Sequence, residues 1–160
     1  MTARLNLQET TPDAYRRMGA LEQAAHQASS KAGIPQALYH LVKVRASQLN
    51  GCAFCLDMHT KEARADGEDE QRLYTISAWR ETSFFSEQER AALALAEQVT
   101  RISEGGVSDE VWAQAEKQFN AEQLSALIWA IVAINSWNRM AISTRSPEPG
   151  SYQPQGASRS

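Results

Sequence analysis

The feature that most constrains the fold of this chain is the helical spacing of its apolar residues, which runs from about Pro12 to Thr144. No stretch combines alternating apolar and polar residues with turn signals at its ends, as a half-buried strand would. The chain has 160 residues, of which 42% are hydrophobic, and this is enough for one domain with its own core. We therefore expect an all-α protein with a single compact multi-helix domain.

Start and stop signals divide this region into about seven helices. Pro12 suits the first position of a helix, and Ser86 with Glu89 forms a capping-box pair. Asn50 and Gly51 tolerate the left-handed turn that ends a helix just before the first cysteine. The expected helices cover about residues 12–32, 35–50, 52–65, 70–79, 86–104, 108–119 and 121–143.

The composition changes abruptly after Arg145. Residues 146–160, SPEPGSYQPQGASRS, contain three of the five prolines and show no apolar periodicity. This pattern predicts a helical domain over residues 1–145 and a disordered C-terminal tail over 146–160. The last helix is apolar on nearly all sides, which predicts that it is buried centrally or in a subunit interface, with Trp129 and Trp137 as core or interface anchors.

Charge and hydropathy exclude several kinds of partner. The chain has 16 basic and 19 acidic residues and a formal net charge of -3, without a basic stripe for nucleic acid or a polybasic patch for a membrane surface. The longest apolar run, Ala126 to Ile134, is shorter than the roughly 20 residues that cross a bilayer. The N-terminus lacks the apolar segment of a secretory signal. We therefore expect a cytoplasmic protein without nucleic-acid or membrane partners.

Both cysteines and one of the three histidines lie in the stretch NGCAFCLDMHTKEA, residues 50–63. In a reducing compartment, two cysteines separated by two residues are more often catalytic, redox-sensing or metal-binding than a permanent disulfide. If a helix begins at Cys52, then Cys55 and His59 follow at i+3 and i+7 on the same face. A helix N-terminus favours thiolate over thiol, and the pKa of CxxC thiols there falls from about 8.5 to about 7 or lower.

These groups can support thiol chemistry. His59 can take the thiol proton as a general base, because an unperturbed imidazole titrates near neutrality. A thiolate that attacks a peroxide oxygen becomes a sulfenic acid, and a second thiol two residues away can condense with it to a disulfide. The CxxC pair thus supplies both the attacking and the resolving thiol. Spacing alone does not show which of Cys52 and Cys55 attacks.

Three other interpretations remain open at this point. The two thiols can be buried cysteines that only pack. Together with His59 and the upstream His40 they can form a two-cysteine, two-histidine zinc site in a structural module, although structural zinc cysteines usually sit on a tight turn rather than at a helix start. The pair can also switch an interaction or sense redox state without turnover.

The segment RASQLNGCAFCLDMHTKEAR, residues 45–64, closely resembles the motif of the alkylhydroperoxidase D-like proteins of the carboxymuconolactone decarboxylase superfamily. The resemblance continues through residues 73–102 and 133–143. It implies an all-helical fold, symmetric homo-oligomers that are often trimers or hexamers, and peroxidase activity fed by a dithiol or disulfide-reductase electron donor. It implies a hydroperoxide substrate and neither a metal nor an organic cofactor.

Carried over by position, Cys55 is the peroxidatic thiolate, Cys52 its resolving partner and His59 the base of the proton relay. The family commonly has a glutamate twelve residues before the first cysteine, where this chain has His40, so we expect a relay that is weaker or differently tuned. Phe54 stands where other members have a histidine. The decarboxylase members typically lack the CxxC pair, so its presence favours redox chemistry.

The remaining polar candidates receive structural roles. His26 is expected to be an ordinary surface residue of the first helix. Asn135, Asn138 and Arg139 follow the apolar run of the last helix and need hydrogen-bond partners there. We expect them to cap neighbouring backbone or to bind across an interface, with the border of the thiol site as the alternative.

Overall fold

The computed structural model describes residues 2–154, and within them the chain is helical and contains no strand. The all-α prediction is therefore confirmed. The elements, in chain order, are α1 (Leu7–Thr10), α2 (Pro12–Lys31), α3 (Gln36–Asn50), α4 (Ala53–Ala65), α5 (Glu70–Thr75), the 3₁₀ helix η1 (Ile76–Glu81), α6 (Glu87–Thr100), the 3₁₀ helix η2 (Ile102–Glu104), α7 (Asp109–Gln118) and α8 (Ala121–Thr144).

The helix termini follow the sequence signals closely. Pro12 stands at the first turn of α2, and the Ser86–Glu89 pair closes a capping box at the start of α6. Gly51 ends α3 with a φ of 71°, in the left-handed region. Three details differ: α1 was not predicted, the expected helix over 70–79 divides into α5 and η1 with a kink at Ala78 inside η1 (φ -116°, ψ 29°), and the expected helix over 86–104 divides into α6 and η2 at Arg101 (φ -101°, ψ 42°).

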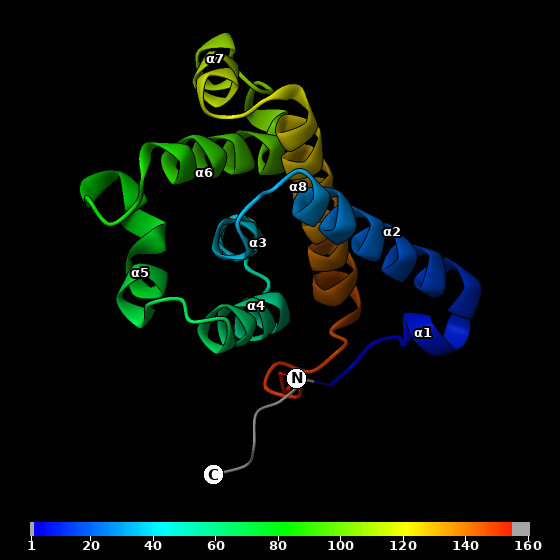
Figure 1. Cartoon of the computed structure of the whole chain (residues 1–160). Coiled ribbons are helices and arrows are strands. Elements are labelled where there is room, and N and C mark those ends of the chain that lie inside the picture. Colours follow the sequence, from blue (N-terminus) through cyan, green and yellow to red (C-terminus); the bar gives the residue numbers. More distant parts are fainter. Residues whose placement is uncertain (1, 155–160) are drawn as a thin grey trace.

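Helix α3 is the centre of the fold. It packs against α4, α6 and α8, and Figure 1 shows it with α6 and α4 on opposite sides. Nine of its fifteen residues are buried, so neighbouring helices cover most of its surface and not just one narrow stripe. The functional residues on α3 are consequently held by neighbours on three sides.

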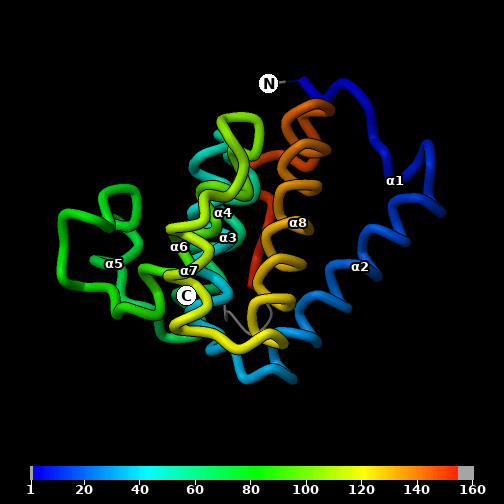
Figure 2. The backbone as a smooth tube through the Cα atoms, turned by 90° about the horizontal axis from the view of Figure 1, so that it is seen from above, coloured from blue at the N-terminus to red at the C-terminus, as the bar shows by residue number. Residues whose placement is uncertain are grey.

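Helix α8 is the second long support. It lies between α2 on one side and α3 on the other, as the view in Figure 2 shows. Its buried face includes Leu127, Ile131 and Ile134, all fully buried. The predicted burial of α8 is only partial, because Trp129, Val132 and Ile142 remain 48%, 37% and 45% exposed in the single chain.

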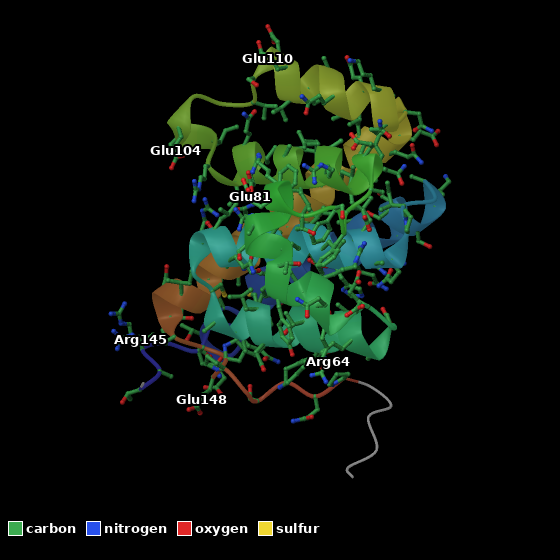
Figure 3. The ribbon with its side chains drawn as sticks, turned by 90° about the vertical axis from the view of Figure 1, so that its left-hand side faces the viewer. Arg64, Glu81, Glu104, Glu110, Arg145 and Glu148 are labelled. Atoms are coloured by element: carbon green, nitrogen blue, oxygen red, sulfur yellow. The ribbon has the colours of Figure 1, made fainter. Side chains whose placement is uncertain are left out.

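Many charged residues lie on the outer surface, as Figure 3 shows for Arg64, Glu81 and Glu110. None of the helices within residues 2–154 is both long enough and apolar enough to span a membrane. Of the predicted tail, residues 146–154 pack against α4: the Lys61 ammonium donates to the carbonyl of Tyr152 (3.0 Å), and the Gly150 N–H donates to Asp57 (3.1 Å). Residues 155–160 lie outside the described part.

Candidate functional site

The two cysteines meet at the junction of α3 and α4. After the left-handed turn at Gly51, the Cys52 N–H donates to the carbonyl of Ser47 (3.0 Å), and Cys52 becomes the residue that precedes the first turn of α4. Cys55 lies in that first turn. The cysteines are 3.0 Å apart, free and almost completely buried, with exposed fractions of 1% and 2%. The predicted pairing of two thiols at a helix start is present.

The two thiols titrate as a pair. The hydrogen bond with Cys55 lowers the pKa of Cys52 to about 7, and the backbone N–H groups at the start of α4 act in the same direction. The same hydrogen bond and burial raise the pKa of Cys55. The pair therefore holds one negative charge and one proton near neutral pH. Because a single proton lies between two close sulfurs, its transfer can place the thiolate on either residue.

Asn138 supports this charge from α8. Its side chain is fully buried and hydrogen-bonds to both thiols, which lowers the pKa of each. Its amide also donates to Ser47 (3.1 Å), and its oxygen accepts from Asn50 (2.8 Å). The sequence favoured a structural role for Asn138 over one at the border of the thiol site, and the structure gives it both.

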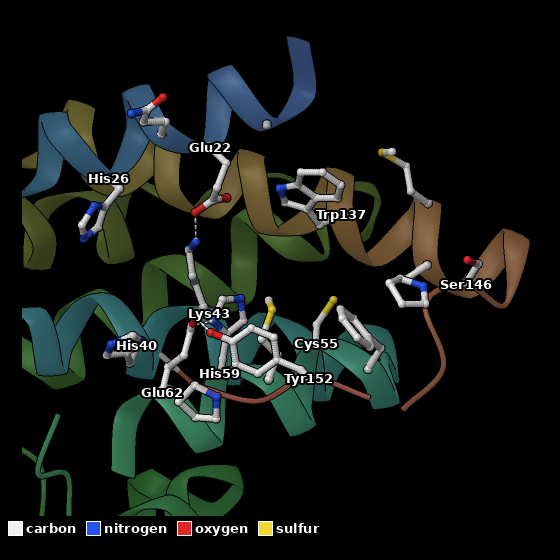
Figure 4. Close-up of a pocket in the computed structure, with 18 of the residues that line it drawn as sticks. Glu22, His26, His40, Lys43, Cys55, His59, Glu62, Trp137, Ser146 and Tyr152 are labelled. Carbon is white, nitrogen blue, oxygen red and sulfur yellow. Dashed lines mark hydrogen bonds and ion pairs between the residues drawn. The ribbon is translucent and has the colours of Figure 1, made fainter. Parts of the chain in front are cut away.

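A cavity of about 850 Å³ lies beside the thiol pair, between α2, α3, α4, α8 and the segment 146–154. Cys55 lines this cavity and Cys52 does not. Aromatic residues form much of its wall: Tyr15, Phe54, Trp137 and Tyr152. Figure 4 shows Cys55, His59, Glu62 and Tyr152 around the same space. Access to a substrate therefore differs between the two sulfurs in favour of Cys55.

Trp137 packs against the core cluster that contains both cysteines and Ile134, in line with its predicted role as a core anchor, and it also borders the cavity. It is partly buried, lines the cavity and packs edge-on against Tyr15 of α2, with ring centroids 5.4 Å apart. Trp129, two turns earlier, lies outside the core with nearly half its surface exposed. The sequence could not separate these two positions because α8 is apolar on most sides.

His59 lies one turn beyond Cys55 on α4 and also lines the cavity. Burial lowers the pKa of His59, so its imidazole is neutral at pH 7. Its Nδ1 hydrogen-bonds to Glu62 Oε2 at 2.9 Å, and Tyr152 donates its hydroxyl to the other oxygen of Glu62 at 2.7 Å. Burial raises the pKa of Glu62, but the bonds from His59 and Tyr152 outweigh it and hold it at about 2. Glu62 is therefore a carboxylate that orients the His59 ring.

His40 lies on α3 with only 4% of its surface exposed. Its Nε2 contacts Asp66 Oδ2 at 2.8 Å and the Gln36 side-chain nitrogen at 3.0 Å, while its Nδ1 is buried and has no hydrogen-bond partner within the described residues. The rings of His40 and His59 are 6.5 Å apart between centroids. The predicted proximity of His40 to the site is present, and a carboxylate, Glu62, is close to both histidines.

A buried ion pair closes the other side of the cavity. The Lys43 ammonium donates to Glu22 Oε1, which also accepts the Tyr39 hydroxyl (2.9 Å). Burial lowers the pKa of Lys43; in Glu22, burial raises the pKa but attraction to Lys43 outweighs it and the net shift is downward. The Lys43 charge also favours a thiolate on Cys55. Figure 4 shows this pair reaching across the cavity from α3 to α2.

Sequence reasoning missed four residues of this site: Glu22, Lys43, Glu62 and Tyr152. Glu62 carried a signal, since it follows His59 at i+3 on one helix face. Glu22 and Lys43 lie 21 positions apart, and Tyr152 lies in the predicted tail, so no local pattern links them to the cysteines.

The predicted zinc set of two cysteines and two histidines does not come together. Within residues 2–154, the only group of three potential ligands is His40, His59 and Glu62, and it contains neither cysteine. The cysteines are instead buried in a core cluster with Ala46 and Ile134. The third histidine, His26, is exposed as predicted, although its side chain reaches the edge of the cavity.

Comparisons with known proteins agree with this architecture. The model of the carboxymuconolactone decarboxylase family matches residues 12–98. The uncharacterized protein YdfG of Bacillus subtilis (strain 168) is 42% identical over 142 residues, which cover 89% of this chain and 94% of YdfG. The uncharacterized protein YnjA of Escherichia coli (strain K12) is 29% identical over 87 residues, 54% of this chain and 47% of YnjA.

Solved structures show the same fold. A protein of unknown function from Agrobacterium tumefaciens, described as a putative antioxidant defence protein AhpD, superposes with a TM-score of 0.86 at 40% identity, covering 92% of this chain and 99% of that one. The debrominase Bmp8 superposes with a TM-score of 0.76 at 20% identity, covering 86% of this chain and 72% of that one. At that identity the second likeness concerns the fold alone.

Proposed function

This chain belongs to the carboxymuconolactone decarboxylase family, and within that family we propose that it is a thiol-dependent peroxidase that reduces hydroperoxides through the Cys52–Cys55 pair. The observation that carries the proposal is the close, buried thiol pair at the start of α4, with Cys55 facing a cavity that His59 also lines. The resemblance of the CxxC segment to the alkylhydroperoxidase D-like motif supports it.

The first chemical step is attack by the Cys55 thiolate on one oxygen of a hydroperoxide. The O–O bond breaks, Cys55 becomes a sulfenic acid, and the leaving oxygen takes a proton to become an alcohol. The neutral His59 imidazole, oriented by Glu62, is the group that exchanges protons with the thiol pair. Cys55 is assigned as attacker because it lines the cavity. Since the shared hydrogen bond lowers the pKa of Cys52 and raises that of Cys55, the proton of Cys55 passes to Cys52 or to His59 before the attack.

The second step is condensation of Cys52 with the sulfenic acid. A disulfide forms and one water molecule leaves, so both cysteines remain oxidised at this point. An external dithiol then reduces the disulfide by exchange and is itself oxidised to a disulfide. The cycle consumes one hydroperoxide and one dithiol per turnover. The donor is therefore a dithiol or a disulfide-reductase partner, and no metal or organic cofactor takes part.

The experiment that tests this function measures hydroperoxide consumption with a defined dithiol. We expect turnover by the wild-type chain, loss of turnover in Cys55→Ser, and trapping of a stable sulfenic acid on Cys55 in Cys52→Ser, because that variant lacks the resolving thiol. His59→Gln should lower kcat by about 10²–10⁴-fold, the usual contribution of a general base. Glu110→Gln, at an exposed carboxylate of α7 that does not line the cavity, is the control.

The outcomes separate the proposal from the alternatives. Full turnover in Cys55→Ser would assign the attack to Cys52. Formation of the disulfide without steady-state turnover, together with a change in oligomer size on oxidation, would instead identify a redox-responsive interaction protein.

A further inference from the structure

Two histidines and a glutamate of the site also form a group of potential metal ligands, and the proposed thiol mechanism uses two of them, His59 and Glu62, but not His40. His40, His59 and Glu62 each offer one ligand atom, and these atoms lie within 4.8 Å of one another. The three residues come from α3 and α4, both histidines are buried, and all three line the cavity. A small ion can therefore reach them from the cavity.

His40 carries the clearest sign of a missing partner. Its Nε2 contacts both Asp66 Oδ2 (2.8 Å) and the Gln36 side-chain nitrogen (3.0 Å), and in the tautomer that donates to Asp66 the Nδ1 carries a lone pair. That Nδ1 is buried and has no hydrogen-bond partner among residues 2–154. A histidine that donates one ring N–H to a carboxylate and leaves its other nitrogen free has the arrangement of metal-binding histidines. His59 has a similar carboxylate contact through Glu62.

The local charge also favours a cation. The carboxylates of Glu62 and Asp66 lie beside the two histidines, and the nearby basic residues are already paired. Lys43 binds Glu22, Lys61 binds Asp57, and Arg64 binds Glu70. Within residues 2–154, Glu62 and Asp66 form ion-pair contacts with His59 and His40 and with no lysine or arginine, although the Lys43 charge also acts on Glu62.

We propose that His40, His59 and Glu62 form a binding site for a divalent transition-metal ion of the zinc type. Two imidazoles and one carboxylate suit zinc, cobalt or nickel, whereas magnesium and calcium prefer oxygen ligands alone. Donors about 2.0–2.2 Å from a tetrahedral zinc stand about 3.5 Å apart, so binding draws the three side chains together by roughly 1 Å. The cavity leaves the fourth position open to water.

Metal binding at this site would oppose the thiol chemistry. An ion bound to His59 occupies the imidazole lone pair that exchanges protons with the cysteines. The ion then acts as a reversible inhibitor of the proposed peroxidase and not as its cofactor. The metal site nevertheless stands on its own residues and does not depend on the peroxidase proposal.

The test uses the full chain with both cysteines replaced, Cys52→Ser/Cys55→Ser, so that neither thiol can bind metal or turn over. We expect calorimetry to show one Zn²⁺ per chain. Co²⁺ should give the weak visible absorption of nitrogen and oxygen ligands in this variant. In the wild-type chain it should give the same spectrum without a thiolate-to-cobalt band. His40→Gln in the same background should weaken Zn²⁺ binding by more than about 100-fold, since even outer-shell partners contribute 10–100-fold.

Two further variants keep the test decisive. Asp66→Asn changes a half-exposed residue and should weaken binding about tenfold or more by removing the carboxylate that orients His40, even if His40→Gln proves unstable. Glu110→Gln, at an exposed carboxylate of α7 that does not line the cavity, should bind Zn²⁺ as tightly as its parent. The proposal is overturned if Zn²⁺ does not bind the cysteine-free chain, if binding requires the thiols, or if folded His40→Gln or Asp66→Asn binds with unchanged affinity.

Discussion

The hydrogen bond between the two cysteines is the contact that sets the reactivity of this site. Cys55 is the first cause of the lowered pKa of Cys52, and Asn138 and the helix N–H groups add to it. A cysteine beside an apolar cavity without such donors would keep a pKa near or above about 8.5. The reactivity of one sulfur thus depends on the side chain at the other position.

Replacing Cys55 by serine or by alanine tests this dependence. Serine keeps a hydroxyl that can donate to the Cys52 thiolate, whereas alanine removes the donor. Because only thiolate reacts with an alkylating reagent, the rate for Cys52 should rise with pH through a midpoint near the pKa, about 7 in the reduced wild type. We expect a modest upward shift in Cys55→Ser and a shift toward about 8.5 in Cys55→Ala.

The measurement is the alkylation rate from pH 5 to 10 on fully reduced protein, followed by mass spectrometry of the modified peptide. Circular dichroism on each variant controls for folding. Equal midpoints in Cys55→Ser and Cys55→Ala would show that the helix N-terminus and Asn138, rather than the second thiol, hold the charge.

Among the secondary-structure elements, Glu97 of α6 is the main polar link behind the site. Its carboxylate accepts hydrogen bonds from Arg45 of α3 (2.7 Å) and from Trp79 (2.9 Å) and Arg80 (2.6 Å) of η1. The Arg45 and Glu97 side chains are only 13% and 14% exposed. This contact fixes the central helix α3, and therefore His40 and Lys43, relative to α6.

Glu97→Ala should lower the free energy of unfolding by about 2–3 kcal/mol, because it leaves a mostly buried Arg45 without its carboxylate. Glu97→Gln keeps an acceptor oxygen and should cost less. Chemical denaturation measures both. The exposed pair Arg101–Glu104 provides the control, since Glu104→Ala should change stability by less than about 1 kcal/mol.

The contribution of Glu97 to the free energy of unfolding also depends on pH and decreases in acid. Burial raises the pKa of Glu97, but hydrogen bonds from Trp79, Arg80 and Arg45 outweigh it, so the folded-state value lies below the ordinary one. The stabilisation is therefore complete above the unfolded pKa of about 4.3 and is lost as the pH falls through the lower folded value. The stability difference between wild type and Glu97→Gln should shrink in that acid range, and a constant difference would contradict the ion-pair interpretation.

At the scale of the whole molecule, the sequence predicted those features that depend on residues close together in the chain. Capping residues and Gly51 placed helix ends, and the CxxC and i, i+4 spacings placed Cys52 beside Cys55 and Cys55 with His59 on the cavity wall. The cavity could not be predicted in this way, because it forms where α2, α3, α4 and α8 meet. Tyr152 shows the limit most clearly: nothing in the proline-rich segment around it indicates that its hydroxyl reaches Glu62.

Assembly into a homo-oligomer, which the family resemblance predicts, likewise cannot be derived from local sequence patterns. Helices α7 and α8 leave Trp112, Trp129 and Val132 between 37% and 48% exposed, and the two tryptophans line one surface cleft. Large apolar side chains gathered on one face are typical of subunit interfaces. We therefore expect a homo-oligomer, such as a trimer or hexamer, that covers this face.

Light scattering coupled to size-exclusion chromatography tests this expectation, because any assembly exceeds the 17.7 kDa of one chain. A buried charge without a partner costs several kcal/mol in an interface, so Trp129→Glu should shift the protein toward smaller species at equal concentration. Phe84→Glu is the matched control, since Phe84 is similarly exposed (46%) but lies before α6, away from α8. If Phe84→Glu dissociates the assembly and Trp129→Glu does not, the interface lies on the other side of the molecule, near the loop that leads into α6.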